Sequence, residues 1–117
     1  MTEAIHLLSA CEIRDRVRSG DLTAVAVVEA CLGRIDALNP ELGAFLEVYR
    51  ERALAQASAI DAKRAAGEPL GKLAGVPVGI KDNIHVKGEL TTCASKFLTN
   101  YRAPFAATAV RLIEEAD

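Results

Sequence analysis

The sequence predicts an α/β fold in which helices surround a mixed sheet, and three features lead to this prediction. Helical and strand-like segments alternate along the chain, as they do in layered α/β proteins. Half of the 117 residues are hydrophobic and 26% are charged, a composition and length that suit one globular domain. Only two segments have strand character, and two strands do not make an independently stable sheet. We therefore predict that the central sheet is incomplete in this chain.

Three helices are predicted in the first part of the chain. Residues 9–20 open with the S-x-x-E pattern of a capping box and close with a glycine, which tolerates the left-handed conformation at a helix end. In residues 23–38 apolar side chains recur at spacings of three and four, and Asn39-Pro40 is expected to end that helix. Residues 50–66 are rich in alanine and predict a third helix.

Two strands and a last helix complete the expected order of elements. Residues 44–49 are rich in strand formers, and residues 76–81 have the low polarity of a strand that is covered on both faces. A final helix is expected to begin after Pro104, and no stop signal follows it. We therefore divide one domain into residues 1–67, mainly helical with one strand, and residues 68–117, with a strand, a loop and the start of a helix.

Charge and cysteine content exclude several classes of protein. The net charge of -2 is spread without a basic patch, so this chain is not expected to hold a nucleic acid by itself. No apolar run is long enough to span a membrane and no secretion signal is recognisable, which favours the cytoplasm. Cys11, Cys31 and Cys93 lack metal-ligand spacing, and His6 and His85 are isolated, so no metal site is predicted. Cys11 and Cys31 are expected to be small core residues with reduced thiols.

Lys81 is the candidate for chemistry, because it follows an apolar strand and precedes Asp82 and Asn83. One interpretation is the solvated end of a strand. The other is a lysine in a partly desolvated cleft, since desolvation lowers the pKa of an amine and lets it act as a base near neutral pH. From the chemistry alone the first interpretation is favoured. No serine in the chain lies in a G-x-S-x-G nucleophile elbow.

Three segments resemble a known family and reverse that preference. Residues 75–83, GVPVGIKDN, are similar to the strand that carries the catalytic lysine in the amidase-signature family. Residues 91–98, TTCASKFL, resemble a block of its tRNA amidotransferase A subunits, and residues 104–110 resemble the start of the helix that follows. The resemblance extends along essentially the whole chain and identifies it as the N-terminal part of such a protein. It implies that Lys81 is a catalytic residue.

The resemblance also implies a reaction and partners. In this family a lysine acts as general base through a cis-serine on a nucleophilic serine. Lys81 matches that lysine, whereas both serines lie in a Gly-Ser-rich segment without a counterpart here, and Ser95 belongs to a different block. The expected activity is glutamine hydrolysis that supplies ammonia.

The expected partners are the amidotransferase B and C subunits. The B subunit would use the ammonia, with ATP and Mg²⁺, to amidate mischarged tRNA. The C subunit would complete a heterotrimer. The resemblance implies that tRNA is bound mainly by the first of these partners. No cofactor of its own and no membrane association are expected for the present chain.

Two departures from the family pattern limit these expectations. Family members are several times longer, so the chain is expected to be a fragment that is inactive alone. Ala106 stands where the family has an Asp at a helix start, and the loss of that cap is expected to cost about 1 kcal/mol. Two alternatives remain open: part of a general amidase acting on other carboxamides, and a short stand-alone helical interaction module. The choice between tRNA(Gln) and tRNA(Asn) also stays open.

Overall fold

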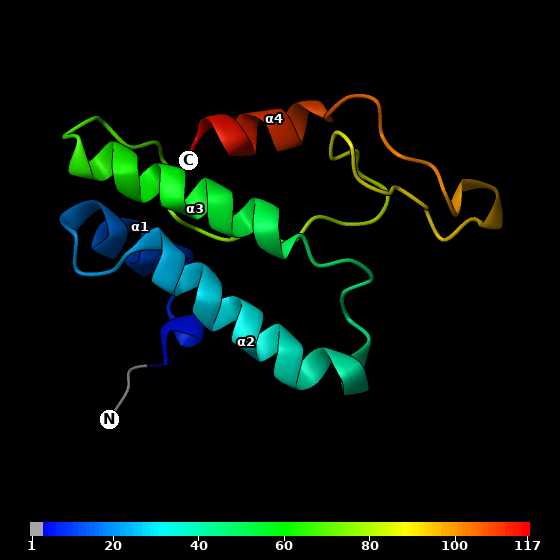
Figure 1. The fold of residues 1–117 in the computed structure, drawn as a ribbon, viewed down its shortest axis with the longest axis horizontal. Coiled ribbons are helices and arrows are strands. Elements are labelled where there is room, and N and C mark those ends of the chain that lie inside the picture. Colours follow the sequence, from blue (N-terminus) through cyan, green and yellow to red (C-terminus); the bar gives the residue numbers. More distant parts are fainter. Residues whose placement is uncertain (1–3) are drawn as a thin grey trace. The chain divides into compact units, whose positions relative to one another are not determined.

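The computed structural model describes residues 4–117, which form two compact units. The first unit contains the described residues up to Pro77 together with Ala116 and Asp117, and the second is Val78–Glu115. The helical elements in chain order are η1 (Ile5–Leu7), α1 (Ala10–Ser19), α2 (Ala24–Leu42), α3 (Arg50–Ala65), η2 (Lys96–Leu98) and α4 (Thr108–Glu115) (Figure 1).

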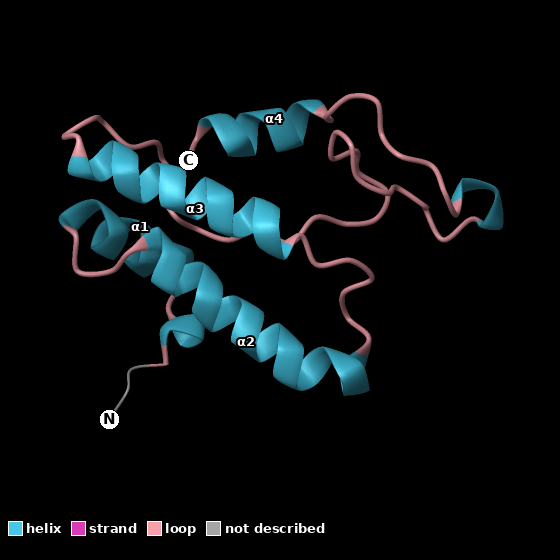
Figure 2. Ribbon diagram, viewed as in Figure 1, coloured by secondary structure: helices cyan, strands magenta, loops and turns pink. Residues whose placement is uncertain are grey.

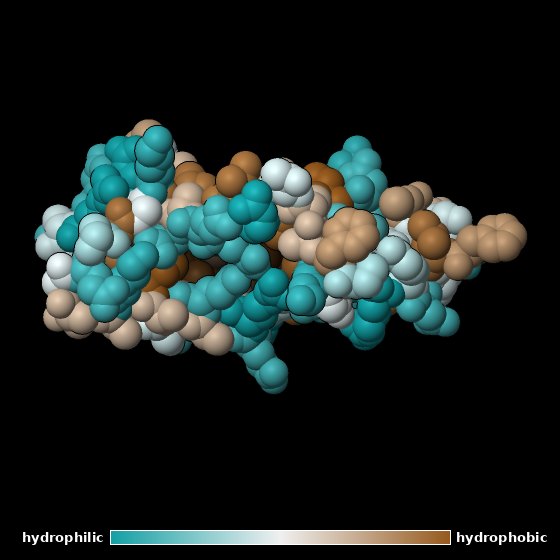
Figure 3. All heavy atoms as spheres, turned by 90° about the horizontal axis from the view of Figure 1, so that it is seen from above, coloured by the Kyte–Doolittle hydropathy of each residue, from teal (hydrophilic) through white to brown (hydrophobic). Residues whose placement is uncertain are grey.

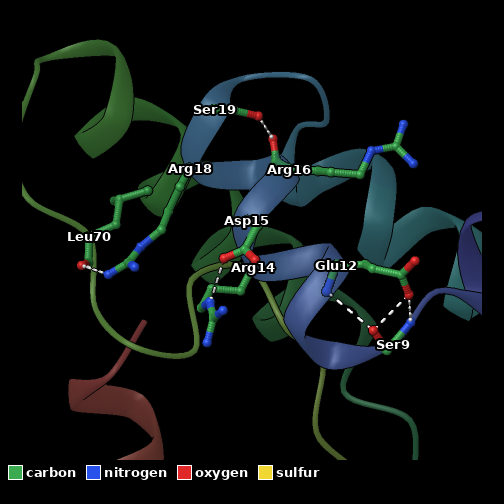
Figure 4. Close-up of polar contacts among 8 residues, drawn as sticks. All are labelled: Ser9, Glu12, Arg14, Asp15, Arg16, Arg18, Ser19 and Leu70. Atoms are coloured by element: carbon green, nitrogen blue, oxygen red, sulfur yellow. Dashed lines mark hydrogen bonds and ion pairs between the residues drawn. The ribbon is translucent and has the colours of Figure 1, made fainter.

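Helix α1 begins and ends where its sequence predicted. The N–H of Glu12 donates to Ser9 Oγ at 3.3 Å, and the N–H of Ser9 donates to Glu12 Oε2 at 2.8 Å (Figure 4). This reciprocal pair is a capping box, and it satisfies N–H groups that the helix leaves unpaired. The bonds from Ser9 also hold the pKa of the Glu12 carboxyl below its ordinary value. At the other end Gly20 adopts φ +88°, as a helix-ending glycine does.

Helix α2 continues past Pro40, so its predicted end at Leu38 was wrong. A proline removes one N–H and disfavours the helical conformation of the residue before it. A hydrogen bond across the proline keeps the last turn helical, because the N–H of Gly43 donates to the Asn39 carbonyl oxygen at 2.8 Å. Gly43 itself has the left-handed φ of +60° that is common at a helix end. The helix therefore ends at Leu42.

The strand predicted at residues 44–49 does not form. The Asn39 side chain accepts a hydrogen bond from the Phe45 N–H at 2.8 Å and donates one to the Phe45 carbonyl oxygen at 3.0 Å. This side-chain amide occupies the backbone groups with which a strand would pair, and the segment is a loop.

The strand predicted at residues 76–81 does not form either. None of residues 4–117 lies in a β-strand, so the expected mixed sheet is not present in this chain (Figure 2). A strand needs a neighbour to accept its backbone hydrogen bonds, and the described residues place none beside this segment. The one β-like pairing within the described range is an isolated bridge between Leu90 and Arg102.

The core of the first unit is helical. Helices α2 and α3 run in opposite directions and pack side by side (Figure 1). The buried side chains of this core are all aliphatic: Ile13, Val17, Ala24, Val27, Val28, Leu32, Ala57 and Ala74. Cys31 is half-buried, and burial raises the pKa of its thiol. Cys11 is exposed, so its prediction as a core residue was wrong.

A carboxylate from α3 stabilises the start of α2. Asp61 accepts hydrogen bonds from the N–H groups of Ala24 at 2.8 Å and Val25 at 3.1 Å, while Thr23 Oγ1 accepts from Ala26 at 3.0 Å. Three of the N–H groups that a helix leaves unpaired at its start are thus satisfied. The negative charge also lies at the positive end of the helix dipole.

We expect Asp61→Ala to lower the free energy of unfolding by about 1–2 kcal/mol, the usual effect of removing such a cap. Urea unfolding followed by far-UV circular dichroism measures it. Asp36→Ala is the matched control, because Asp36 forms an exposed ion pair with Arg50 at 2.6 Å, and pairs of this kind contribute about 0–1 kcal/mol. An equal loss in both variants would contradict the capping role.

The second unit is built on an irregular antiparallel pairing. The N–H of Gly88 donates to the Ala103 carbonyl oxygen at 2.8 Å, and the N–H of Thr91 donates to that of Tyr101 at 3.0 Å. The His85 ring lies against Phe105, with ring centroids 4.9 Å apart. Residues 92–100 form the loop between the paired segments and contain η2.

Helix α4 begins later than the sequence predicted. The N–H of Ala107 donates to the His85 carbonyl oxygen at 2.9 Å, so the residues after Pro104 extend the paired segment rather than a helix. The first helical bond runs from the Arg111 N–H to the Ala107 carbonyl oxygen at 3.0 Å. Ala106 therefore precedes the first helical residue, Thr108, and the expected cost of a lost cap at position 106 stays a prediction.

Apolar side chains also reach the surface of each unit. In the first unit Leu42 and Leu46 are 66% and 73% exposed, and in the second Phe97 is 100% exposed. Figure 3 shows apolar side chains among charged ones on one face of the molecule. Within residues 4–117 no helix combines the length and the apolar character that crossing a membrane requires.

Candidate active site

Lys81 lies at the start of a tight turn in the second unit. The N–H of Ile84 donates to the Lys81 carbonyl oxygen at 3.0 Å, which closes a turn over residues 81–84. The Lys81 side chain is exposed in this structure. The turn, rather than a strand, therefore determines the direction in which the side chain leaves the backbone.

Asp82 connects this turn to residues 91–98, which open with Thr91 and Thr92 and which we call the threonine block. Its Oδ1 accepts a hydrogen bond from the Thr92 N–H at 2.9 Å, and its Oδ2 accepts a short one from the Thr92 hydroxyl. The Asp82 carbonyl oxygen accepts a third from the Cys93 N–H at 3.1 Å. We call the two side-chain bonds between Asp82 and Thr92 the Asp82–Thr92 clamp.

The clamp affects the ionisation of its carboxylate. The hydroxyl of Thr92, and then its N–H, hold the pKa of Asp82 below the ordinary value for an aspartate. Hydrogen bonds donated to a carboxylate stabilise its charged form. Asp82 is therefore ionised at neutral pH and accepts bonds through both oxygens.

Two residues next to the clamp have an unusual backbone. Cys93 and Ala94 adopt φ +51° and +57°, a left-handed conformation that costs about 1–2 kcal/mol for a residue other than glycine. The N–H of Ser95 donates to the Thr92 carbonyl oxygen at 2.8 Å. Positive φ at both central residues makes Thr92–Ser95 a type I′ turn.

Thr91 precedes this turn and is buried, with 1% of its surface exposed. Its Oγ1 is a buried side-chain oxygen without a hydrogen-bond partner in the structure. The N–H of Thr91 nevertheless donates to the Tyr101 carbonyl oxygen, as described above. Of the two threonines, Thr91 is therefore bonded to Tyr101 and Thr92 to Asp82.

These contacts bring together segments that the sequence separates by ten residues. Asp82, one partner in the clamp, directly follows Lys81. Thr92, the other partner, is the first residue of the left-handed turn. The sequence indicates Lys81 and the threonine block separately, and no pattern in it indicates the hydrogen bonds between Asp82 and Thr92. Within the described residues 4–117 no group of three His, Cys, Asp or Glu side chains is placed to hold a metal ion.

The chain is similar to proteins of a known family. The family model described as "Amidase" matches residues 26–117, and the chain therefore belongs to the amidase family. A relative from Chlamydia felis (strain Fe/C-56), named as one of the glutamyl-tRNA(Gln) amidotransferase A subunits, is 56% identical over 109 residues. The alignment covers 93% of this chain and 22% of the relative, so the chain spans about a fifth of that protein's length.

Solved structures share the arrangement of the chain. A bacterial aryl acylamidase belonging to the amidase-signature enzymes superposes with a TM-score of 0.91 at 28% identity, covering 98% of this chain and 24% of that one. A chain from a vestigial protein complex that reveals the evolutionary origins of an s-triazine catabolic enzyme gives a TM-score of 0.90 at 34% identity. It covers 93% of this chain and 24% of that chain.

Proposed function

We propose that this chain supplies the catalytic lysine of a glutamine-hydrolysing protein, one of the glutamyl-tRNA(Gln) amidotransferase A subunits. The observation that carries the proposal is the 56% identity, over 93% of the chain, to a relative of that name. Residues 75–83 and 91–98 lie inside the segment that the amidase family model matches. The proposed function belongs to the whole protein, because the relatives are several times longer than this chain.

In the proposed reaction Lys81 acts on serines that lie outside these 117 residues. As a neutral amine it takes a proton through a bridging cis-serine from the nucleophilic serine, which attacks the side-chain amide carbon of glutamine. The proton passes to the leaving nitrogen, ammonia departs and a glutamyl ester forms. Water then attacks this ester, which releases glutamate and restores the serine.

The remaining proposals concern partners, which are the amidotransferase B and C subunits. The first would bind ATP and Mg²⁺ and use the ammonia to amidate mischarged tRNA, and the second would complete a cytoplasmic heterotrimer. The name of the Chlamydia felis relative implies further subunits. A net charge of -2 without a basic patch supports tRNA binding mainly through a partner. We propose no cofactor for the glutamine-hydrolysing protein itself.

We also propose that residues 76–81 become a strand of a larger mixed sheet when the rest of an amidase domain is present. Val78 is 45% exposed although the segment is apolar. Large exposed apolar side chains are typical of a surface that other protein covers. The aligned solved chains are about four times longer, since this chain covers 24% of each.

A chimera tests the proposed function directly. The 109 matching residues of this chain would replace their counterparts in the Chlamydia felis protein, and the chimera would be assembled with the other subunits of that enzyme. We expect ammonia release from glutamine at a rate near that of the parent, because the proposal assigns the same role to both segments. Enzymatic determination of glutamate and ammonia measures it.

A general amidase is the second candidate, favoured by the TM-score of 0.91 to an aryl acylamidase. Hydrolysis of glutamine and of a nitroacetanilide would be compared in the chimera and in the parent enzyme. Preference for the anilide in the chimera alone would favour the general amidase. Loss of glutamine hydrolysis in a soluble, assembled chimera would contradict the proposed glutamine-hydrolysing function.

A further inference from the structure

We propose that Asp82 and Thr92 are positioning residues for Lys81, acting as one unit through the Asp82–Thr92 clamp. This inference rests on the proposed function, because it assumes that Lys81 takes part in the reaction. It adds two residues that the resemblance did not assign. Neither is proposed to touch the substrate, and both act through the backbone that follows Lys81.

The hydrogen bonds around Lys81 support this role. The carbonyl oxygen of Lys81 is held by the Ile84 N–H at 3.0 Å, and the next carbonyl oxygen, that of Asp82, is held by the Cys93 N–H at 3.1 Å. The Asp82 side chain is fixed at both oxygens by Thr92. Peptide planes on the carboxyl side of Lys81 are thus held in place, and so is the direction of its Cα–Cβ bond.

The clamp also stabilises a turn whose backbone conformation is unfavourable by itself. The left-handed conformations of Cys93 and Ala94 are unfavourable for residues other than glycine, and they persist only where the surroundings hold them. The clamp contributes to this stabilisation. The Thr92 hydroxyl that donates a hydrogen bond to Asp82 also accepts one from the Ala94 N–H at 3.3 Å. Lys81 is therefore coupled to a rigid turn rather than to a free loop.

A long, flexible lysine gains most from such anchoring at its base. Misplacement of a reacting group by about 1 Å can lower a rate by about 100-fold. Charge-assisted bonds to a carboxylate are shorter and stronger than neutral ones, so an ionised Asp82 is suited to hold the turn. The clamp should therefore influence the catalytic rate more than substrate binding.

The test uses the assembled chimera and measures kcat and KM for glutamine. Asp82→Ala and Thr92→Val should each lower kcat by about 10- to 100-fold, with KM unchanged within about twofold. The double variant should be no slower than the slower single variant, because both substitutions break one unit. Thr92→Ser and Asp82→Asn should restore most of the rate, since both keep hydrogen bonds at these positions.

Thr99→Val is the matched control. The Thr99 hydroxyl lies in the same loop and donates to the Lys96 carbonyl oxygen at 2.8 Å, but it does not contact Asp82. This variant should keep kcat within about twofold of the unsubstituted chimera. Ammonium-dependent amidation and the thermal midpoint are measured for every variant, so that a general loss of structure is recognised.

Each outcome decides the inference. Unchanged kcat in Asp82→Ala and Thr92→Val would overturn it, as would a fall in rate that also raises KM or removes ammonium-dependent amidation. If Asp82→Ala does not fold, Thr92→Val decides by the same criteria, and Thr92→Ser remains the variant that should keep most of the rate. Activity retained in Lys81→Ala would instead refute the proposed function, whereas inactive Lys81→Ala beside fully active clamp variants would refute this inference alone.

Discussion

Lys81→Ala is expected to abolish glutamine-dependent amidation in the assembled chimera and to leave ammonium-dependent amidation near its unsubstituted rate. Lys81 is proposed to make ammonia and has no part in using it. Removing one member of a catalytic unit typically lowers kcat by about 10³-fold or more. Both nitrogen sources are supplied in turn to one enzyme preparation, and amidated tRNA is measured.

Lys96→Ala is the control for this substitution. Lys96 is an exposed lysine at the start of η2 in the same unit, so the substitution removes an equal charge away from the clamp. Both nitrogen sources should support amidation in that variant. If Lys81→Ala loses activity with ammonium as well, Lys81 has a structural or interface role, and the catalytic assignment is wrong.

The helices of the first unit were predictable because their signals are local. The capping box at Ser9 and Glu12 and the left-handed Gly20 act within a few residues of each other, and all three behave as their types suggest. The alanine-rich segment forms α3 within one residue of its expected end. Nearest-neighbour chemistry is sufficient for such elements.

The strands were mispredicted because their stability depends on partners far away in the sequence. Residues 44–49 and 76–81 have strand-forming side chains, but a strand exists only when another backbone accepts its hydrogen bonds. The Asn39 amide takes the backbone groups of Phe45 in the first case. No local pattern indicates that a side chain will compete in this way. Helix α2 likewise continues past Pro40, where the Gly43 N–H donates to the Asn39 carbonyl oxygen. The helix propensities of the single residues do not predict this bond.

The candidate site was half predictable for a similar reason. Lys81 came from a resemblance to a family, while the Asp82–Thr92 clamp came from the structure alone. Turns with two positive φ angles are usually marked by glycine or asparagine, and Cys93-Ala94 gives no such signal. A carboxylate and a hydroxyl ten residues apart cannot be paired from spacing when the turn that joins them is unmarked.

Gly75 opens the segment that resembles the family, and its substitution should produce a large loss of stability in the first unit. Gly75 has φ +72°, and a Cβ there would lie 3.0 Å from Val17 Cγ2 and 3.1 Å from Ala24 Cβ. Val17 and Ala24 are both fully buried, at 0% exposure, so making room for a methyl group requires a shift within the close-packed core. Backbone strain of about 1–2 kcal/mol adds to overpacking of about 1–3 kcal/mol. Gly75→Ala should therefore lower the free energy of unfolding by about 2–5 kcal/mol.

Gly43→Ala separates the two causes. Gly43 also has a positive φ, +60°, but a Cβ at that position would meet nothing within 4 Å, so only the strain of about 1–2 kcal/mol remains. Urea unfolding followed by circular dichroism compares the two variants at equal protein concentration. An equal loss of unfolding free energy in both variants would mean that α1 and α2 leave room for a methyl group beside residue 75. Glycine would then be needed at that position only because of its positive φ. A larger loss in Gly75→Ala would show that the glycine is required because the core of the first unit closes directly over it.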